Sequence, residues 1–205
     1  MPALTAALKD EDIATRENAV LALAKIGPEA KEAVPALGKL LLEETTTRRM
    51  RVQIVTTLGD FGVVAKPAVP DMIQAFADEK LEKELQDVQK VGALNNLMKE
   101  GFQKEGVTLT LDIVRSNVLK KVDKEFQDKN VEALHKIGKV TVPFLTKRLG
   151  DGNTFVRWGS MKTLALFGPQ AKAAAQSLYF YGRQEPVAEI KKDAEKAWKK
   201  VTNQL

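Results

Sequence analysis

A leucine followed four positions later by a glycine recurs along this chain, and successive glycine places are 30 to 39 residues apart. The pairs are Leu23 with Gly27, Leu58 with Gly62, Leu97 with Gly101, Leu134 with Gly138 and Leu164 with Gly168, and a sixth place in this register falls on Trp198 and Thr202. A repeat of about 30 to 40 residues with helical spacing inside it is typical of an α-solenoid, in which each repeat packs on its neighbours.

Each glycine ends a predicted helix with one apolar face. In the first unit Ala19, Leu23 and Ile26 share that face, because their spacings return to the same side of a 3.6-residue turn. The glycine supplies a C-cap, and a pair such as Val34 and Pro35 then favours a new helix start. Each repeat is therefore predicted to be a helical hairpin.

The sequence thus predicts an all-α chain, a single domain that forms an α-solenoid of about six helical hairpins. The predicted repeats cover about residues 1–30, 31–64, 65–104, 105–140, 141–170 and 171–205. In this register the recurring leucines, Leu58 and Leu134 among them, lie in the interior between helices.

Two distant units agree without a gap: eleven residues between Pro2 and Ala33 recur 141 positions later, between Pro143 and Ala174. Their shared Pro-x-Leu start, turn Asp, Arg, Leu and Gly-Pro ending resemble HEAT repeats, particularly the bacterial phycobilisome-lyase-like type. The resemblance is closest over residues 1–78 and 137–175. It implies a right-handed superhelix in which one set of helices lines a concave surface.

The resemblance also implies a ladder of Asp–Arg pairs between neighbouring repeats. By position, this ladder would join Asp10 or Asp12 to Arg16, and Asp151 to Arg157.

The middle of the chain departs from the pattern. Thr47 stands where the second repeat should carry an acid, and the third repeat has a long charged turn over residues 78–89. The fourth repeat lacks the proline and has Gln127 in place of the basic residue, so the choice of Gly101 as its boundary follows from register alone.

Residue types argue against catalysis. The chain has no cysteine and one histidine, His135, which excludes disulfides, thiolate metal sites and the paired His-Glu ligands of deoxyhypusine hydroxylases. No serine lies in a nucleophile elbow, and no glycine-rich phosphate loop is present. We therefore expect neither enzymatic activity nor a cofactor.

Charge is divided unevenly along the chain. Residues 129–205 carry 14 Lys and Arg against 6 Asp and Glu, a net charge of +8, whereas residues 1–128 have a net charge of −3. Two places before the recurring glycine stand Lys25, Lys99, Lys136 and Lys200. Such a column can bind phosphates or acidic proteins, although lysine there also complements the helix dipole.

Combining this column with neighbouring polar and aromatic residues gives a candidate binding surface on the concave or basic side. Its members are Lys25, Gln53, Asn96, Lys99, Lys136, Trp158, Lys162, Lys196 and Lys200. The favoured function is a non-enzymatic scaffold that binds a protein partner on the concave face of the solenoid, as a fragment or module of a larger bacterial protein. The main alternative is a nucleic-acid-binding module with weak binding through the basic half.

Two enzyme classes remain as minor alternatives. One is bilin lyase activity, suggested only by the family resemblance. The other is excision of alkylated bases from DNA, for which Trp158 would need Asp193 or Asp151 as its acid partner.

The N-terminus begins Met1-Pro2-Ala3-Leu4, which aligns with the middle of the repeat start at residues 33–37. This predicts either excision from a longer protein or end-to-end self-association. The sequence offers no stretch long and apolar enough for a membrane span. A cytoplasmic location is favoured, with secretion or a periplasmic location as the alternative if the N-terminus is truncated.

Overall fold

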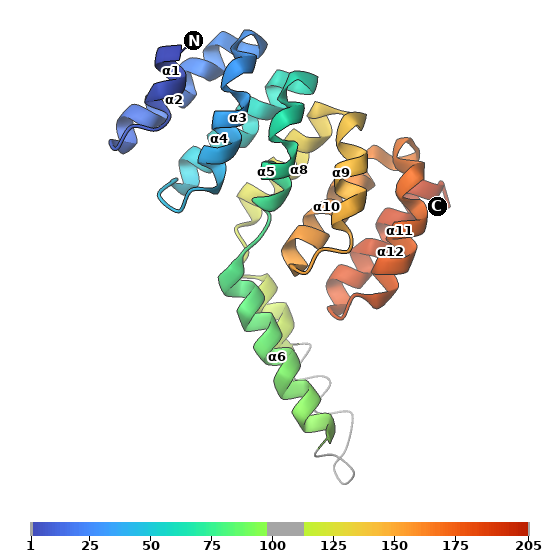
Figure 1. Ribbon diagram of the computed structural model, residues 1–205. Coiled ribbons are helices and arrows are strands. Elements are labelled where there is room, and N and C mark those ends of the chain that lie inside the picture. The colour runs from blue at the N-terminus through green and yellow to red at the C-terminus, as the bar shows by residue number, and fades with distance from the viewer. Residues whose placement is uncertain (1, 98–112, 205) are drawn as a thin grey trace.

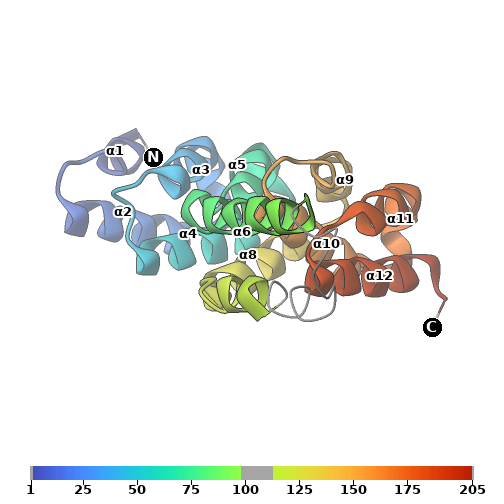
Figure 2. The same cartoon turned by 90° about the horizontal axis from the view of Figure 1, so that it is seen from below.

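The computed structural model describes residues 2–97 and 113–204, and these residues form helices and turns with no strand. Most of the helices lie in two rows (Figure 1, Figure 2). The first row holds α1 (Pro2–Ala7), α3 (Val34–Leu42), α5 (Val69–Gln74), α9 (Val142–Arg148) and α11 (Ala175–Gln184). The second row holds α2 (Ile13–Ile26), α4 (Arg48–Phe61), α8 (Lys124–Ile137), α10 (Thr154–Phe167) and α12 (Ala188–Thr202). This arrangement is the predicted all-α solenoid.

Short 3₁₀ segments lead from each second-row helix to the next first-row helix. They are η1 (Gly27–Ala33), η2 (Gly62–Ala68), η3 (Lys139–Thr141) and η4 (Gly168–Ala174). None of the described helices is long and apolar enough to cross a membrane.

Short polar side chains fix where the second-row helices begin. Asp12, Thr47 and Asp123 each accept a hydrogen bond from the backbone N–H three residues further on. Asn153 accepts two, from the N–H groups two and three residues further on. Such a cap pairs a donor that a helix start otherwise leaves without a partner. Thr47 therefore caps α4 as Asp12 caps α2.

Glycine fixes where four of these helices end. Gly27, Gly62, Gly138 and Gly168 have φ between 52° and 100° with ψ between −135° and −170°. This backbone region is open almost only to glycine, because any larger residue would place its Cβ against the backbone. The last helix ends at Thr202, and Asn203 takes the left-handed conformation instead.

Four of the recurring leucines form the interior, as predicted, whereas the side chain of Leu97 lies outside the described residues. Leu23, Leu58, Leu134 and Leu164 are fully buried. Trp198, in the sixth place, is partly buried against the same core. Small residues let the second-row helices approach closely, since a Cβ on Gly59 of α4 would lie 2.9 Å from the Cβ of Ala133 in α8.

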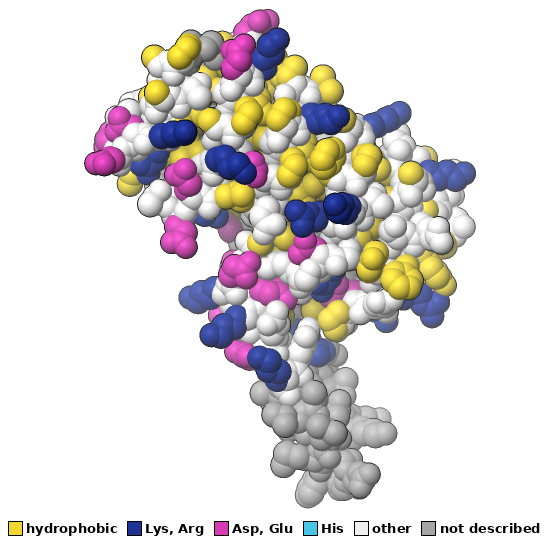
Figure 3. Space-filling view, viewed as in Figure 1, with side chains coloured by type: hydrophobic (Ala, Val, Ile, Leu, Met, Phe, Trp, Pro, Cys, Tyr) yellow, Lys and Arg dark blue, Asp and Glu magenta, His cyan; other side chains and the backbone are white. Residues whose placement is uncertain are grey.

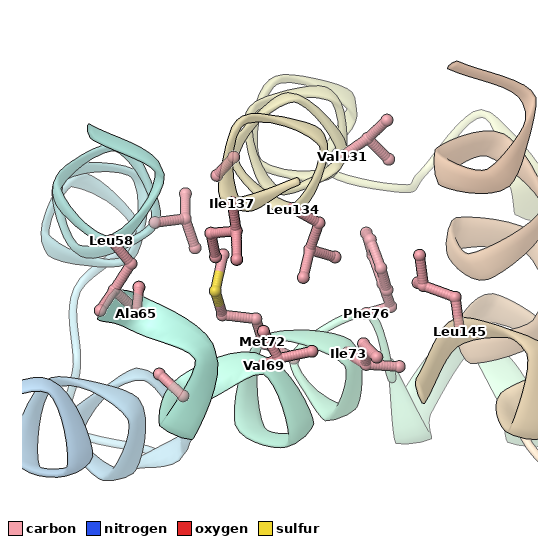
Figure 4. Packing of buried hydrophobic residues seen from close by; sticks show 14 of the residues in the cluster. Leu58, Ala65, Val69, Met72, Ile73, Phe76, Val131, Leu134, Ile137 and Leu145 are labelled. Atoms are coloured by element: carbon pink, nitrogen blue, oxygen red, sulfur yellow. The ribbon is translucent and has the colours of Figure 1, made fainter. Parts of the chain in front are cut away.

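The third layer corrects the predicted register. Helix α8 packs directly beside α4 in the second row, and α5 faces α8 across the same layer. Figure 4 shows Met72 of α5 reaching Ile137 of α8, and both side chains belong to the same buried core. The predicted repeats 65–104 and 105–140 are therefore wrong as separate layers: they contain the two halves of one layer.

Residues 78–122, here called the insert, lie between these halves. Helix α6 (Glu79–Leu97) projects from the two rows (Figure 1), and the helix at residues 113–119 packs beside it through Val118 against Leu81 and Leu85. This pair is a further helical hairpin outside the rows. Gly101, the predicted repeat boundary, lies outside the described residues.

The insert is anchored to the beginnings of α10 and α12. Glu82, 7% exposed, accepts hydrogen bonds from the backbone N–H of Thr154 at 2.7 Å and from its hydroxyl at 3.2 Å. Phe155 joins the apolar cluster of the insert, and Ser116 donates to Glu189 at 2.9 Å. The base of the insert is thus fixed against the C-terminal layers.

The predicted Asp–Arg ladder takes a different form. Arg16 donates to the backbone carbonyls of Asp10 at 2.7 Å and Glu11 at 3.0 Å, and reaches the Thr45 carbonyl of the next layer at 3.5 Å. The carboxylates of Asp10 and Asp12 accept backbone N–H groups within their own turn. A guanidinium can join several carbonyls because its five donors are spread in a plane.

Arg157 repeats this arrangement in the fourth layer. It donates to the carbonyls of Asp151 and Gly152 and makes a two-pronged ion pair with the buried Glu185 of the next layer. The Asp151 carboxylate instead pairs with Arg148. The arginines therefore join layers through carbonyls and Glu185, and the predicted Asp151–Arg157 side-chain pair is wrong.

Candidate functional site

The outer faces of α8, α10 and α12 form a groove of about 370 Å³. It is lined by Asp128, Val131, Glu132, Lys162, Ala165, Leu166, Asp193, Lys196 and Lys200. Three residues of the predicted surface, Lys162, Lys196 and Lys200, meet here because equivalent positions of stacked repeats fall on one face.

The floor of the groove is apolar. Leu166 is 46% exposed and lies beside Ala165 on α10, with Val131 of α8 next to them. The capping by Asn153 and the closing Gly168 set where α10 begins and ends, and its other face is buried against the core. The two caps and the packing of its buried face therefore fix the position of the exposed side of α10.

Carboxylates lie beside three lysines of the predicted surface. Lys162 pairs with Asp128 at 3.1 Å, and Lys196 lies 3.6 Å from Asp193. Farther along the row, Lys136 of α8 pairs with Asp60 of α4 at 2.8 Å.

The hydrogen bond to Asp60, together with its charge, raises the pKa of Lys136 above its ordinary value. Two of these pairs, Lys162–Asp128 and Lys136–Asp60, join neighbouring helices, so carboxylates lie among the lysines of the second row.

Trp158 stands at the end of the groove nearest the insert. Its indole N–H donates to Asp193 at 3.0 Å, and the Lys162 ammonium lies 4.9 Å from the ring centroid. The ring also contacts the core and the apolar cluster of the insert. Its polar edge and one face are therefore occupied by the protein itself.

The remaining predicted residues lie elsewhere. Lys25 is exposed on α2, and Gln53 of α4 lines a small recess with Glu17 and Arg49 and donates to Thr57 at 3.4 Å. The side chains of Asn96 and Lys99 lie outside the described residues. The structure does not bring Lys25 or Gln53 to the groove of α8, α10 and α12.

Sequence reasoning missed the floor and the acidic members of the groove. Leu166 occupies the column in which other repeats carry Lys or Asp, so an apolar residue at an exposed place was the signal for it. Asp128 and Glu132 carried no such signal, because an acid on a polar helix face is ordinary.

The first-row side of the molecule, opposite the groove, carries both charged and hydrophobic side chains (Figure 3). Figure 3 shows Lys and Arg interspersed with hydrophobic side chains there, and both signs of charge over the base of the insert.

Metal chemistry finds no support in the part of the chain that the structure describes. No three His, Cys, Asp or Glu side chains gather there as a ligand set. His135 is exposed, and its ring lies 4.8 Å from that of Phe167.

Comparison with known proteins gives a family match for the N-terminal layers. Residues 1–88 match the family model described as HEAT repeats. The match supports a HEAT-repeat protein. No curated protein matches the sequence. A crystal structure of an engineered protein matches at 17% identity with a TM-score of 0.32, over 98% of this chain and 96% of that chain, a likeness too low to carry an argument.

Proposed function

We propose that the protein is a non-enzymatic interaction scaffold and that its protein partner binds in the groove of α8, α10 and α12. The observation that supports this most is the exposed apolar floor at Leu166, flanked by three carboxylates and three ammonium groups. An apolar centre with a polar rim is the usual composition of a protein interface. HEAT repeats commonly mediate protein–protein interactions, which agrees with the match over residues 1–88.

The ion pairs weigh against the nucleic-acid alternative. Phosphate binding gains its free energy from cations that neutralise the backbone and release counterions. Lys136 and Lys162 already face carboxylates on the protein. Asp128, Glu132 and Asp193 would repel a polyanion in the same groove.

The finer assignments belong to the same proposal. We place the whole chain in one HEAT-repeat domain of the bacterial phycobilisome-lyase-like type, acting as a module of a larger protein. The support is the agreement between residues 2–33 and 143–174, which form equivalent parts of the first and fourth layers.

The test is a pull-down from the source cell with three forms of the chain: wild type, Leu166→Asn and Leu42→Asn. Leu42 is a matched control, since it is 37% exposed but lies on α3 in the other row. We expect a protein that the wild type and Leu42→Asn retain, that Leu166→Asn loses, and that nuclease treatment does not release. Equal retention by all three forms, or release by nuclease, would reject the proposal.

A further inference from the structure

We propose that the groove of α8, α10 and α12 accepts a single amphipathic helix whose two flanks carry opposite charge. This inference rests on the proposed function and names the kind of partner segment that fits the site.

The width of the groove suits one helix. Helices α8 and α12 flank α10, and packed helices lie about 8 to 10 Å apart, so about 16 to 20 Å separates the two rims. A helix with its side chains is about 10 to 12 Å across. One helix can therefore lie over α10, between the rims.

The walls disfavour an extended peptide. An added strand needs free backbone donors and acceptors along a sheet edge, whereas these walls are helices whose backbone groups are bonded internally. An apolar stripe of a helix needs only an apolar floor, and Leu166, Ala165 and Val131 supply one.

The two rims differ in charge. On the α8 side stand Asp128 and Glu132, and on the α12 side stand Lys196 and Lys200. Two further charges line the groove. Lys162, on α10, is paired with Asp128. Asp193, on α12 like the two lysines, accepts a hydrogen bond from the Trp158 indole and lies 3.6 Å from Lys196, so the α12 side keeps a smaller positive charge from Lys196 and Lys200 together.

A neighbouring lysine partly offsets the negative charge of the α8 side of the groove. Lys129 pairs with Glu132 at 3.1 Å, but both side chains are about half exposed. Such an exposed pair is weak and leaves Glu132 able to meet a partner.

A bound helix would therefore present Lys or Arg to α8 and Asp or Glu to α12. Reversing its chain direction exchanges its flanks, so a helix with segregated charges fits in one direction only. The rims thus select direction as well as composition.

The experiment uses the full chain and two synthetic helical peptides of identical composition. Both carry a leucine stripe; the segregated peptide has Lys on one flank and Glu on the other, and the mixed peptide alternates them. We expect the segregated peptide to bind about tenfold more tightly by fluorescence anisotropy at low salt, with a smaller difference at high salt.

Two variants and one control variant locate the effect. The double variant Lys196→Glu with Lys200→Glu should abolish the preference for the segregated peptide, since both rims are then acidic. Leu166→Asn should weaken both peptides about tenfold, whereas Leu42→Asn should weaken neither. Circular dichroism checks that each variant is folded; these are exposed positions, so folding should persist.

Equal binding of the two peptides, or no binding of either, would overturn the inference. Neither result decides the proposed function, which depends on whether Leu166→Asn loses a cellular protein partner. A partner lost in that pull-down, combined with equal peptide binding, would mean a protein groove without charge-directed helix binding.

Discussion

The second and third layers each pair a first-row helix with a second-row helix, although their chain connections differ greatly. In the second layer only residues 43–47 separate α3 from α4, whereas in the third layer residues 75–123 separate α5 from α8. Arg51 of α4 donates to the Glu43 carbonyl at 3.4 Å, and Gln127 of α8 donates to the Phe76 carbonyl at 3.2 Å. A layer is therefore defined by the faces that its helices bury, and the turn between them can hold a large insertion.

The largest expected effect compares the buried leucines of these layers. Leu58→Ala and Leu134→Ala should each lower the free energy of unfolding by about 2 to 5 kcal/mol, because both side chains are fully buried. Urea unfolding followed by circular dichroism measures this. A loss under about 1 kcal/mol at Leu134 alone would mean that the third layer packs less firmly than the second.

Gly159→Ala tests whether α10 packs over the end of α5. A Cβ at Gly159 would overlap the Phe76 ring, so overpacking should cost about 1 to 3 kcal/mol. Gly152→Ala is the matched control, since nothing lies within 4 Å of its Cβ position. Equal thermal stability of the two variants would place Phe76 away from α10.

Asn130→Ala probes a bond that the first layer lacks. Asn130 occupies the place of Ala19, is fully buried, and donates to the Met72 carbonyl of α5 at 2.7 Å. Its removal should cost about 1 to 3 kcal/mol, because a buried carbonyl loses its partner. An unchanged urea midpoint would show that this bond does not stabilise the third layer.

The smallest effect concerns Asp123, where the chain returns from the insert to α8. Burial alone would raise the pKa of Asp123, but hydrogen bonds from Arg48 and from the Phe126 N–H outweigh it and lower that pKa beneath the ordinary value of an aspartate. Asp123→Asn should therefore cost a little stability above about pH 4, and the difference should vanish as the pH falls through the lowered pKa. Thermal melts at pH 7 and pH 3 measure this; an equal loss at both would exclude the ion pair as its cause.

Local signals predicted local structure well. Four of the leucine places, four of the closing glycines and the three Val-Pro starts correspond to buried side chains, positive φ angles and first-row helices, respectively. Each follows from a few neighbouring residues, because helix periodicity and backbone sterics act over one or two turns.

The insert was missed because register alone cannot tell a layer from an insertion of similar length. The signal against it was the absence of a Val-Pro start between Pro70 and Pro143. The layer-to-layer contacts of Arg157 with Glu185 and of Glu82 with Thr154 join residues far apart in the sequence, and no local pattern encodes such pairs. The acidic side of the groove was missed for the same reason.

Carbodiimide crosslinking of the unmodified chain tests the corrected register most directly. Helices α4 and α8 are neighbours in the structure, and the Lys136 ammonium lies 2.8 Å from the Asp60 carboxylate. Mass spectrometry of the digested monomer should find an amide bond between Asp60 and Lys136. An additional layer between these helices would separate them by about 20 Å, at about 10 Å per layer, so the absence of this crosslink from folded protein that crosslinks Lys162 to Asp128 would contradict the account.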